Sequence, residues 1–329
     1  MTMTVLDAIN KFLYEFSEEK FTNSFVIEKN TNYVDEYLVI FDKVPYRFSE
    51  KGEDMIDTII KAARKAGISD DITATKLDKI VFKKLAELLD DYYPYLAFDI
   101  EPYAHDRKFF LQFNTSCAGF GDYGQIEFTS DIDIEEAFIE SIFSARAELA
   151  VLVDKSKINQ IANYIKYQNS KASYNDAVVV IENENKKISA VTFVNNAINL
   201  NRKKVDLDEV RQSGNYIRHI LDEILGWIIR KDPEIEKYLG KYSNSNDIDD
   251  CLLQDISIMF HKFKNENIRL RISQNINIGG TSPIPKDFFK VQIRDTSSND
   301  LLAESYNKDL RKAVLNVVKK MMRKAAFHP

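Results

Sequence analysis

The sequence predicts an α+β fold in two lobes, each an antiparallel sheet with packed helices. Strand-like runs follow one another through short polar turns such as 182–187, without the helical crossover that parallel neighbours need. Runs with a helical period of apolar residues separate these groups of strands. The chain has 329 residues, whereas a single domain usually has about 100–200. We therefore expect an N-terminal lobe over 1–170 and a C-terminal lobe over 171–329, divided within the polar stretch 168–175.

The first half of the chain alternates between predicted helices and predicted strands. Val5, Ile9 and Phe12 recur at the spacing of an amphipathic helix. β-branched and aromatic residues dominate 25–27 and 37–41, which indicates a hairpin. A helix is expected over 54–66, with Gly67 as its stop. Further helices are expected over 73–92 and 135–153, and further strands over 95–100, 108–113 and 125–128.

The second half repeats this order of elements. Strands are expected over 177–181, 188–194, 197–200, 268–272, 288–294 and 301–305. Helices are expected over 158–167, 207–229, 234–239, 250–263 and 308–325. Two or three strands thus precede a helix four times along the chain. Because these four strand-and-helix units share no residue-level identity, the repetition is compatible both with duplication and with chance.

Charge and cysteine content exclude several classes of protein. The formal net charge is −6, from 45 Lys and Arg against 51 Asp and Glu, so any surface for nucleic acid or anionic membrane must be local. Cys117 and Cys251 lie far apart without a CxxC pattern, which predicts neither a disulfide framework nor a zinc site. The sequence has no secretory signal and no apolar stretch of about 18 residues. We expect a cytoplasmic protein without a membrane span and without a cofactor.

One stretch carries paired carboxylates in a pattern of catalytic interest. The pattern consists of Gly119, Gly124, Ser130, Asp131 and Asp133. It resembles the signature of nucleotidyltransferases of the polymerase β type. The resemblance implies that Asp131 and Asp133 share one face of a strand and hold Mg²⁺ against a nucleoside triphosphate. Phe120 stands where that family has a serine, and Gln125 stands where it has a threonine.

The same residues also fit the start of a helix. Ser130 or Asp131 would cap a helix that begins near Ile134, and Asp133 would lie in its first turn, where acidic side chains complement the helix dipole. This interpretation needs no metal. The third carboxylate of the nucleotidyltransferase site would have to come from residues that mostly lie at strand ends or in turns, namely Asp176, Glu182, Asp206 or Asp208.

The C-terminal helix concentrates positive charge in an acidic chain. Most of its basic residues fall on one helical face, opposite the apolar positions. The full set of basic residues in this helix is Lys308, Arg311, Lys312, Lys319, Lys320, Arg323 and Lys324. Such a helix can contact phosphates or an acidic protein. Five upstream residues would extend the patch if they share its face, namely Arg269, Arg271, Lys286, Lys290 and Arg294.

The order of three strands and a basic helix is similar to double-stranded RNA-binding domains, with 297–300 in place of the glycine-rich turn of that family. We therefore expect a non-enzymatic intracellular binding or assembly component, whose C-terminal basic helix contacts nucleic acid or an acidic protein partner. One alternative is an Mg²⁺-dependent nucleotidyltransferase that uses Asp131 and Asp133. Another is a purely structural subunit of an oligomer or larger complex.

Overall fold

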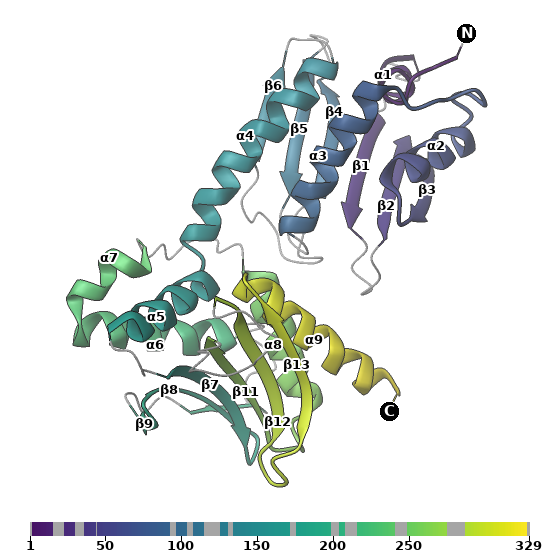
Figure 1. Cartoon of the computed structure of the whole chain (residues 1–329). Coiled ribbons are helices and arrows are strands. Elements are labelled where there is room, and N and C mark those ends of the chain that lie inside the picture. The colour runs from purple at the N-terminus through teal and green to yellow at the C-terminus, as the bar shows by residue number, and fades with distance from the viewer. Residues whose placement is uncertain are drawn as a thin grey trace. The chain divides into compact units, whose positions relative to one another are not determined.

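A computed structural model confirms the α+β fold, with two antiparallel sheets and packed helices (Figure 1). It describes residues 2–15, 23–29, 36–43, 45–92, 97–103, 108–114, 126–130, 134–171, 176–198, 204–207, 216–240, 249–274 and 287–327. The chain divides into two compact units, Met1–Val151 and Leu152–Pro329. The division falls within a long helix, α4 (Ile134–Asp154).

Unit 1 is built around a six-stranded sheet of order β3-β2-β1-β4-β5-β6, in which all neighbours are antiparallel. Its strands are β1 (Asn23–Lys29), β2 (Tyr37–Lys43), β3 (Tyr46–Gly52), β4 (Ala97–Tyr103), β5 (Lys108–Asn114) and β6 (Ile126–Ser130). Its helices are α1 (Val5–Glu15), α2 (Met55–Lys65), α3 (Lys76–Tyr92) and α4. The sequence analysis missed β3, because polar and charged residues dominate this half-exposed edge strand.

Unit 2 contains a seven-stranded sheet of order β10-β8-β7-β11-β12-β13, with β9 also paired to β8. Its strands are β7 (Ala177–Glu184), β8 (Lys187–Val194), β9 (Ala197–Ile198), β10 (Val205–Asp206), β11 (Ile268–Gln274), β12 (Phe289–Asp295) and β13 (Leu301–Asn307). Its helical elements are α5 (Lys157–Lys171), α6 (Tyr216–Lys231), the 3₁₀ turn η2 (Pro233–Ile235), α7 (Glu236–Leu239), α8 (Asp250–Lys262) and α9 (Leu310–Phe327). Helix α5 packs on β7 and α9 of this unit, although the sequence-based division at residue 170 assigns it to the first lobe.

Glycine and asparagine end elements where the backbone must turn left-handed. Gly67 has φ +73° directly after α2, and the amide N–H groups of Gly67 and Ile68 donate to the carbonyls of Arg64 and Ala63. This is the expected glycine stop of the helix. Asn185 and Lys186 both have positive φ in the two-residue turn between β7 and β8, as a type I′ hairpin requires.

Aromatic rings fill the core of unit 1. The Phe41 ring lies 4.9 Å from those of both Phe12 and Phe25, measured between centroids. Phe138 of α4 lies 5.0 Å from Phe98 of β4 in the same way. In unit 2 aliphatic residues of the central strands are buried instead, among them Leu270, Ile272, Val291 and Ile293. Each unit therefore has its own apolar core.

A buried aspartate holds the first helix of each unit. The Asp78 carboxylate accepts hydrogen bonds from the backbone N–H groups of Val5 (3.4 Å) and Leu6 (3.1 Å) at the start of α1. The Asp249 carboxylate, which precedes α8, accepts one from Ile158 (2.9 Å) at the start of α5. Both aspartates are fully buried. The first turn of a helix has backbone donors without intrahelical acceptors, so these carboxylates fix where α1 and α5 begin.

Candidate functional site

Helix α9 begins two residues later than the sequence predicts. The Asp309 carboxylate accepts hydrogen bonds from the N–H groups of Arg311 (2.8 Å) and Lys312 (3.3 Å), so Asp309 caps the helix and Leu310 is its first residue. Lys308 therefore precedes the helix, where its ammonium lies 5.9 Å from the centroid of the Phe288 ring.

The apolar face of α9 packs on β12 and β13, with α5 and α8 beside it. Its buried residues recur at helical spacing and include Leu310, Ala313, Val314, Val317, Val318 and Met321. Arg311 shares this side of the helix and is only 6% exposed. The expectation that Arg311 belongs to a solvent-facing basic surface is therefore wrong. Its position next to the cap places it against the body of the unit.

The other basic residues of α9 form a stripe that is exposed or half-buried. We call the set Lys312, Lys319, Lys320, Arg323 and Lys324 the basic stripe. Lys319 follows Lys312 by seven residues, or about two helical turns, and the remaining members lie one, three or four residues from their neighbours in the set, which keeps the basic stripe on one side of the helix. No aspartate or glutamate occurs between Leu310 and Phe327. The positive charge of this helix therefore has no compensation along the helix itself.

Two lysines of the basic stripe also contact the neighbouring strand. The Lys320 ammonium donates to the backbone carbonyl of Glu304 at 2.6 Å, and the Lys324 ammonium donates to that of Leu302. Both acceptors lie on β13, which is the outer strand of its sheet. Because these acceptors are neutral, the hydrogen bonds position the lysines without removing their charge.

Lys319 faces a buried carboxyl group of α8. Burial raises the pKa of Asp255 from an ordinary 3.8 to about 6, and the positive charge of Lys319 opposes this rise. The aspartate therefore neutralises Lys319 less as the pH falls toward 6. The net positive charge of the basic stripe together with Asp255 increases as this carboxylate is protonated.

This pKa shift predicts a pH-dependent stability. Since Asp255 binds protons more tightly in the folded chain than in the unfolded chain, its contribution to folding is most favourable below about pH 4 and is lost as the pH rises toward about 6. We expect Asp255→Asn to stabilise unit 2 at pH 7 relative to the wild type and to make little difference at pH 4. Urea midpoints followed by Trp227 fluorescence across this range measure the effect. A constant difference between the two proteins would contradict the assignment.

The upstream basic residues lie on a different face of the unit. Arg269 pairs with Arg294 across β11 and β12, and Arg271 and Lys290 point to the same side of the sheet. The opposite side holds Phe289, whose ring lies under Lys166 of α5. Arg269, Arg271, Lys290 and Arg294 therefore do not extend the basic stripe, which lies on the helix-covered side, and Lys286 lies outside the described residues.

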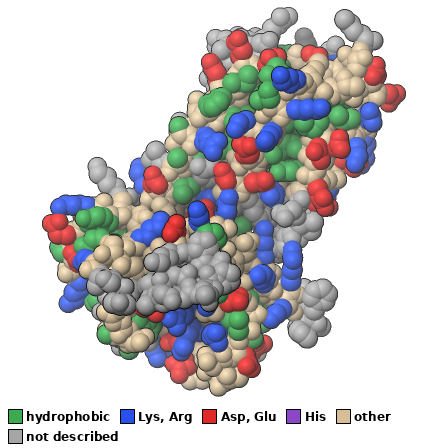
Figure 2. All heavy atoms as spheres, in the orientation of Figure 1, with side chains coloured by type: hydrophobic (Ala, Val, Ile, Leu, Met, Phe, Trp, Pro, Cys, Tyr) green, Lys and Arg blue, Asp and Glu red, His purple; other side chains and the backbone are tan. Residues whose placement is uncertain are grey.

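Acidic side chains accompany this second group. Arg269 forms an ion pair with Glu182 (3.0 Å), and Arg271 forms one with Asp176 (3.3 Å). Figure 2 shows Lys and Arg side chains with Asp and Glu side chains beside them on this part of the surface. The charge there is mixed, in contrast to the residues of α9.

The predicted metal-binding pair, Asp131 and Asp133, lies outside the described residues. Strand β6 ends at Ser130 and α4 begins at Ile134, with two glutamates in its first turn. The expected helix start near Ile134 is thus confirmed, whereas the roles of the two aspartates stay predictions. Among the residues that the structure describes, no group of three or more His, Cys, Asp or Glu side chains could hold a metal ion.

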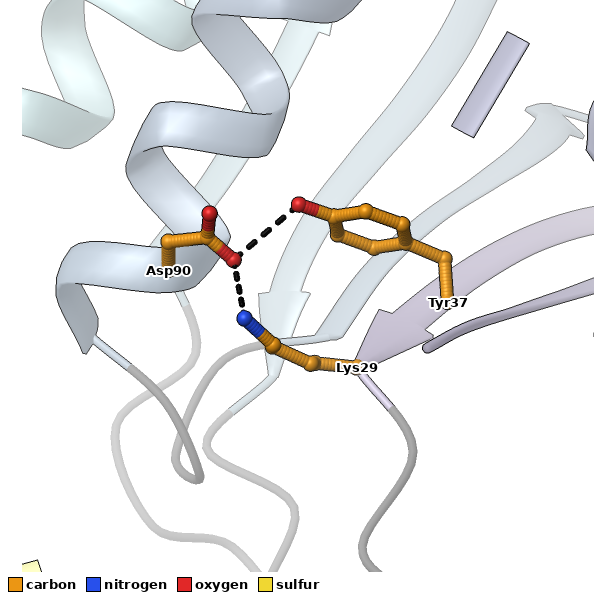
Figure 3. A network of polar contacts seen from close by, with 3 residues as sticks. All are labelled: Lys29, Tyr37 and Asp90. Atoms are coloured by element: carbon orange, nitrogen blue, oxygen red, sulfur yellow. Dashed lines mark hydrogen bonds and ion pairs between the residues drawn. The ribbon is translucent and has the colours of Figure 1, made fainter. Parts of the chain in front are cut away.

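The structure also brings together three polar residues that the sequence analysis did not single out (Figure 3). The Asp90 carboxylate near the end of α3 accepts from the Lys29 ammonium of β1 and from the Tyr37 hydroxyl of β2 at 3.0 Å. Asp90 lies more than fifty positions from both of its donors in the chain, so no local pattern could reveal this contact. Both donors point at one carboxylate, an arrangement that ties α3 to the sheet.

Comparisons with protein-family models, with curated proteins and with solved structures give no match to this chain. Within its described residues, no helix is both long and apolar enough to cross a membrane. The chemistry of the surface therefore has to carry the functional proposal.

Proposed function

We propose that this chain is a non-enzymatic binding or assembly component inside the cell, and that the basic stripe of α9 contacts a polyanionic partner. The partner is nucleic acid or an acidic protein segment. The observation that carries the proposal is an eighteen-residue helix with six basic residues and no acidic one, of which five basic residues reach the exposed side. In a chain of net charge −6 such a surface is a local exception.

The geometry supports contact with a phosphate backbone or a row of carboxylates. An α-helix rises about 1.5 Å per residue, so the positions from Lys312 to Lys324 span roughly 18 Å. Successive phosphates on one strand of a duplex are about 3.4 Å apart along its axis, and each neutralised phosphate releases counterions. Binding through the stripe should therefore weaken steeply as salt is raised.

Charge reversal at two positions of the basic stripe other than Lys320 and Lys324 tests the proposal. We expect Lys312→Glu with Arg323→Glu to lower the affinity for labelled RNA and DNA duplexes of about 20 base pairs, or for a poly-glutamate peptide, by at least about tenfold in roughly 50 mM salt. The salt dependence should fall by about one charge for each phosphate-contacting residue removed. Fluorescence anisotropy of the labelled duplexes and peptide at several salt concentrations gives both quantities.

Exposed lysines of unit 1 supply the matched control. Lys79 and Lys83 lie on the exposed side of α3, and Lys79→Glu with Lys83→Glu makes the same change in net charge. If this control weakens binding as much as the α9 variant does, net charge and not the basic stripe determines binding. Unchanged affinity and salt dependence in the α9 variant would refute the proposal.

A further inference from the structure

The two sheets are assembled in the same way. In each unit a first meander of strands and a second meander meet at a central antiparallel pair, β1 with β4 and β7 with β11. Each unit also begins with a helix that a buried aspartate caps, Asp78 in unit 1 and Asp249 in unit 2. The segment of β1–β3 with α2 is the first meander of unit 1, and the segment of β11–β13 with α9 is the second meander of unit 2, yet each ends in an outer strand that is followed directly by a helix.

These two segments, residues 23–65 and 268–320, correspond residue by residue from their third strand onward. Strands β3 and β13 both have seven residues, and the helix begins three residues after each. An aspartate directly precedes each helix: Asp54 accepts a hydrogen bond from the N–H of Asp57, and Asp309 accepts one from the N–H of Lys312. Both helices thus have an aspartate cap that bonds the N–H three residues on, and Asp309 bonds the N–H of Arg311 in addition.

The correspondence continues to the end of α2. A buried pair of small apolar residues, Ala62 and Ala63 in α2, matches Val317 and Val318 in α9. The next two residues are basic in both helices, Arg64 and Lys65 in the first and Lys319 and Lys320 in the second. Position by position, the same sides of the two helices are buried.

The last lysine of this match makes the same contact in both segments. The Lys65 ammonium donates to the backbone carbonyl of Ser49 at 3.0 Å, and the Lys320 ammonium donates to that of Glu304 at 2.6 Å. Each pair is sixteen residues apart, and each acceptor is the fourth residue of its strand. Lys324 adds a second such bond one helical turn later on β13.

Both acceptor strands are outer strands of their sheets. An outer strand presents a row of backbone N–H and carbonyl groups to which a strand of another molecule can pair, and natural proteins often place lysine there to prevent it. An ammonium group bonded to a carbonyl of such a strand competes for an acceptor that an incoming strand would use. It also adds a charge that such pairing would have to bury.

We propose that residues 23–65 and 268–320 are two copies of one repeat, and that its lysine, Lys65 or Lys320, closes one outer edge of each sheet, β3 or β13, against pairing with a second copy of this chain. The repeat consists of three strands and a helix, and the helix protects the edge of the sheet to which its own strands belong. This inference is independent of the proposed partner of α9, whose test leaves Lys320 and Lys324 in place.

The experiment removes the lysines from the full-length chain and measures its mass in solution. We expect Lys320→Met with Lys324→Met to raise the average mass toward about twice the monomer as concentration rises from about 1 to 100 µM, relative to the wild type at each concentration. Lys65→Met should raise the average mass in the same way, because it frees the Ser49 carbonyl on the outer strand β3. Light scattering after size exclusion gives the mass, and hydrogen exchange should show added protection in residues 301–307 for the first variant. Lys61→Met is the control, because Lys61 is exposed on α2 and makes no hydrogen bond to β3 within the described residues.

A proline at the edge separates strand pairing from aggregation of a misfolded chain. Glu304 lies on the outer strand β13, where proline is tolerated and interrupts pairing with an incoming strand. Adding Glu304→Pro to the double variant should return the mass to the wild-type value. Persistence of the larger species in the triple variant would overturn the proposal, as would an unchanged mass and unchanged exchange of β13 in the double variant.

Discussion

Replacement of Asp222 by alanine is expected to lower the free energy of unfolding of unit 2 by about 3 kcal/mol. Asp222 of α6 forms an ion pair with Lys157 of α5, with 2.6 Å between nitrogen and oxygen. The Lys157 side chain is only 1% exposed, whereas that of Asp222 is 30% exposed. Removing the carboxylate leaves the buried Lys157 ammonium without this opposite charge. Such a loss costs far more stability than breaking an ion pair on the surface.

The single tryptophan makes this measurement specific. Trp227 lies on α6, one turn beyond Asp222, so its fluorescence during urea denaturation reports the unit in which the ion pair lies. The control is Glu234→Ala, since the Glu234–Lys237 pair is about 70% exposed on both sides and should contribute less than about 1 kcal/mol. If Asp222→Ala lowered the free energy of unfolding by no more than Glu234→Ala does, water would have to reach the Lys157 ammonium in solution.

The order of elements could be predicted from the sequence because each element carries its own local signal. The apolar period of Val5, Ile9 and Phe12 and the Asp54 and Gly67 boundaries of α2 need no knowledge of distant residues, and the structure confirms them. Strand β3 lacks such a signal. Four of its seven residues are charged or polar and none is buried, so its pairing with β2 at the margin of the sheet is what makes it a strand.

The candidate site was predictable in composition but not in geometry. The cluster of Lys and Arg in α9 is visible in the sequence, yet the burial of Arg311 depends on where the cap at Asp309 starts the helix. The contacts of Lys320 and Lys324 with β13 depend on how the helix folds back over a strand that precedes it. Such information lies in tertiary packing, so it appears only when the sheet is assembled.

Asp78 supplies the second large effect, this time in unit 1. Besides the N–H groups of Val5 and Leu6, its carboxylate accepts from the backbone N–H and the hydroxyl of Thr75, at 2.7 and 2.8 Å. One buried side chain thus caps α1 and the turn before α3. Asp78→Ala leaves the buried N–H groups of Val5 and Leu6 without that acceptor, and we expect the free energy of unfolding to fall by about 3 kcal/mol.

Three readouts distinguish this role from a general loss of packing. Hydrogen exchange should accelerate first in α1, the far-UV circular dichroism transition should move to lower urea, and the Trp227 transition of unit 2 should stay in place. Asp78→Asn keeps one acceptor oxygen and should therefore lose less stability than the alanine variant. Asp249→Ala should produce the reverse pattern, because it removes the corresponding cap of α5 and moves the Trp227 transition. If Asp78→Asn were as damaging as Asp78→Ala, the negative charge and not the hydrogen bonds would hold the two helix starts together, and the field of the α1 and α3 N-termini would be the dominant contribution.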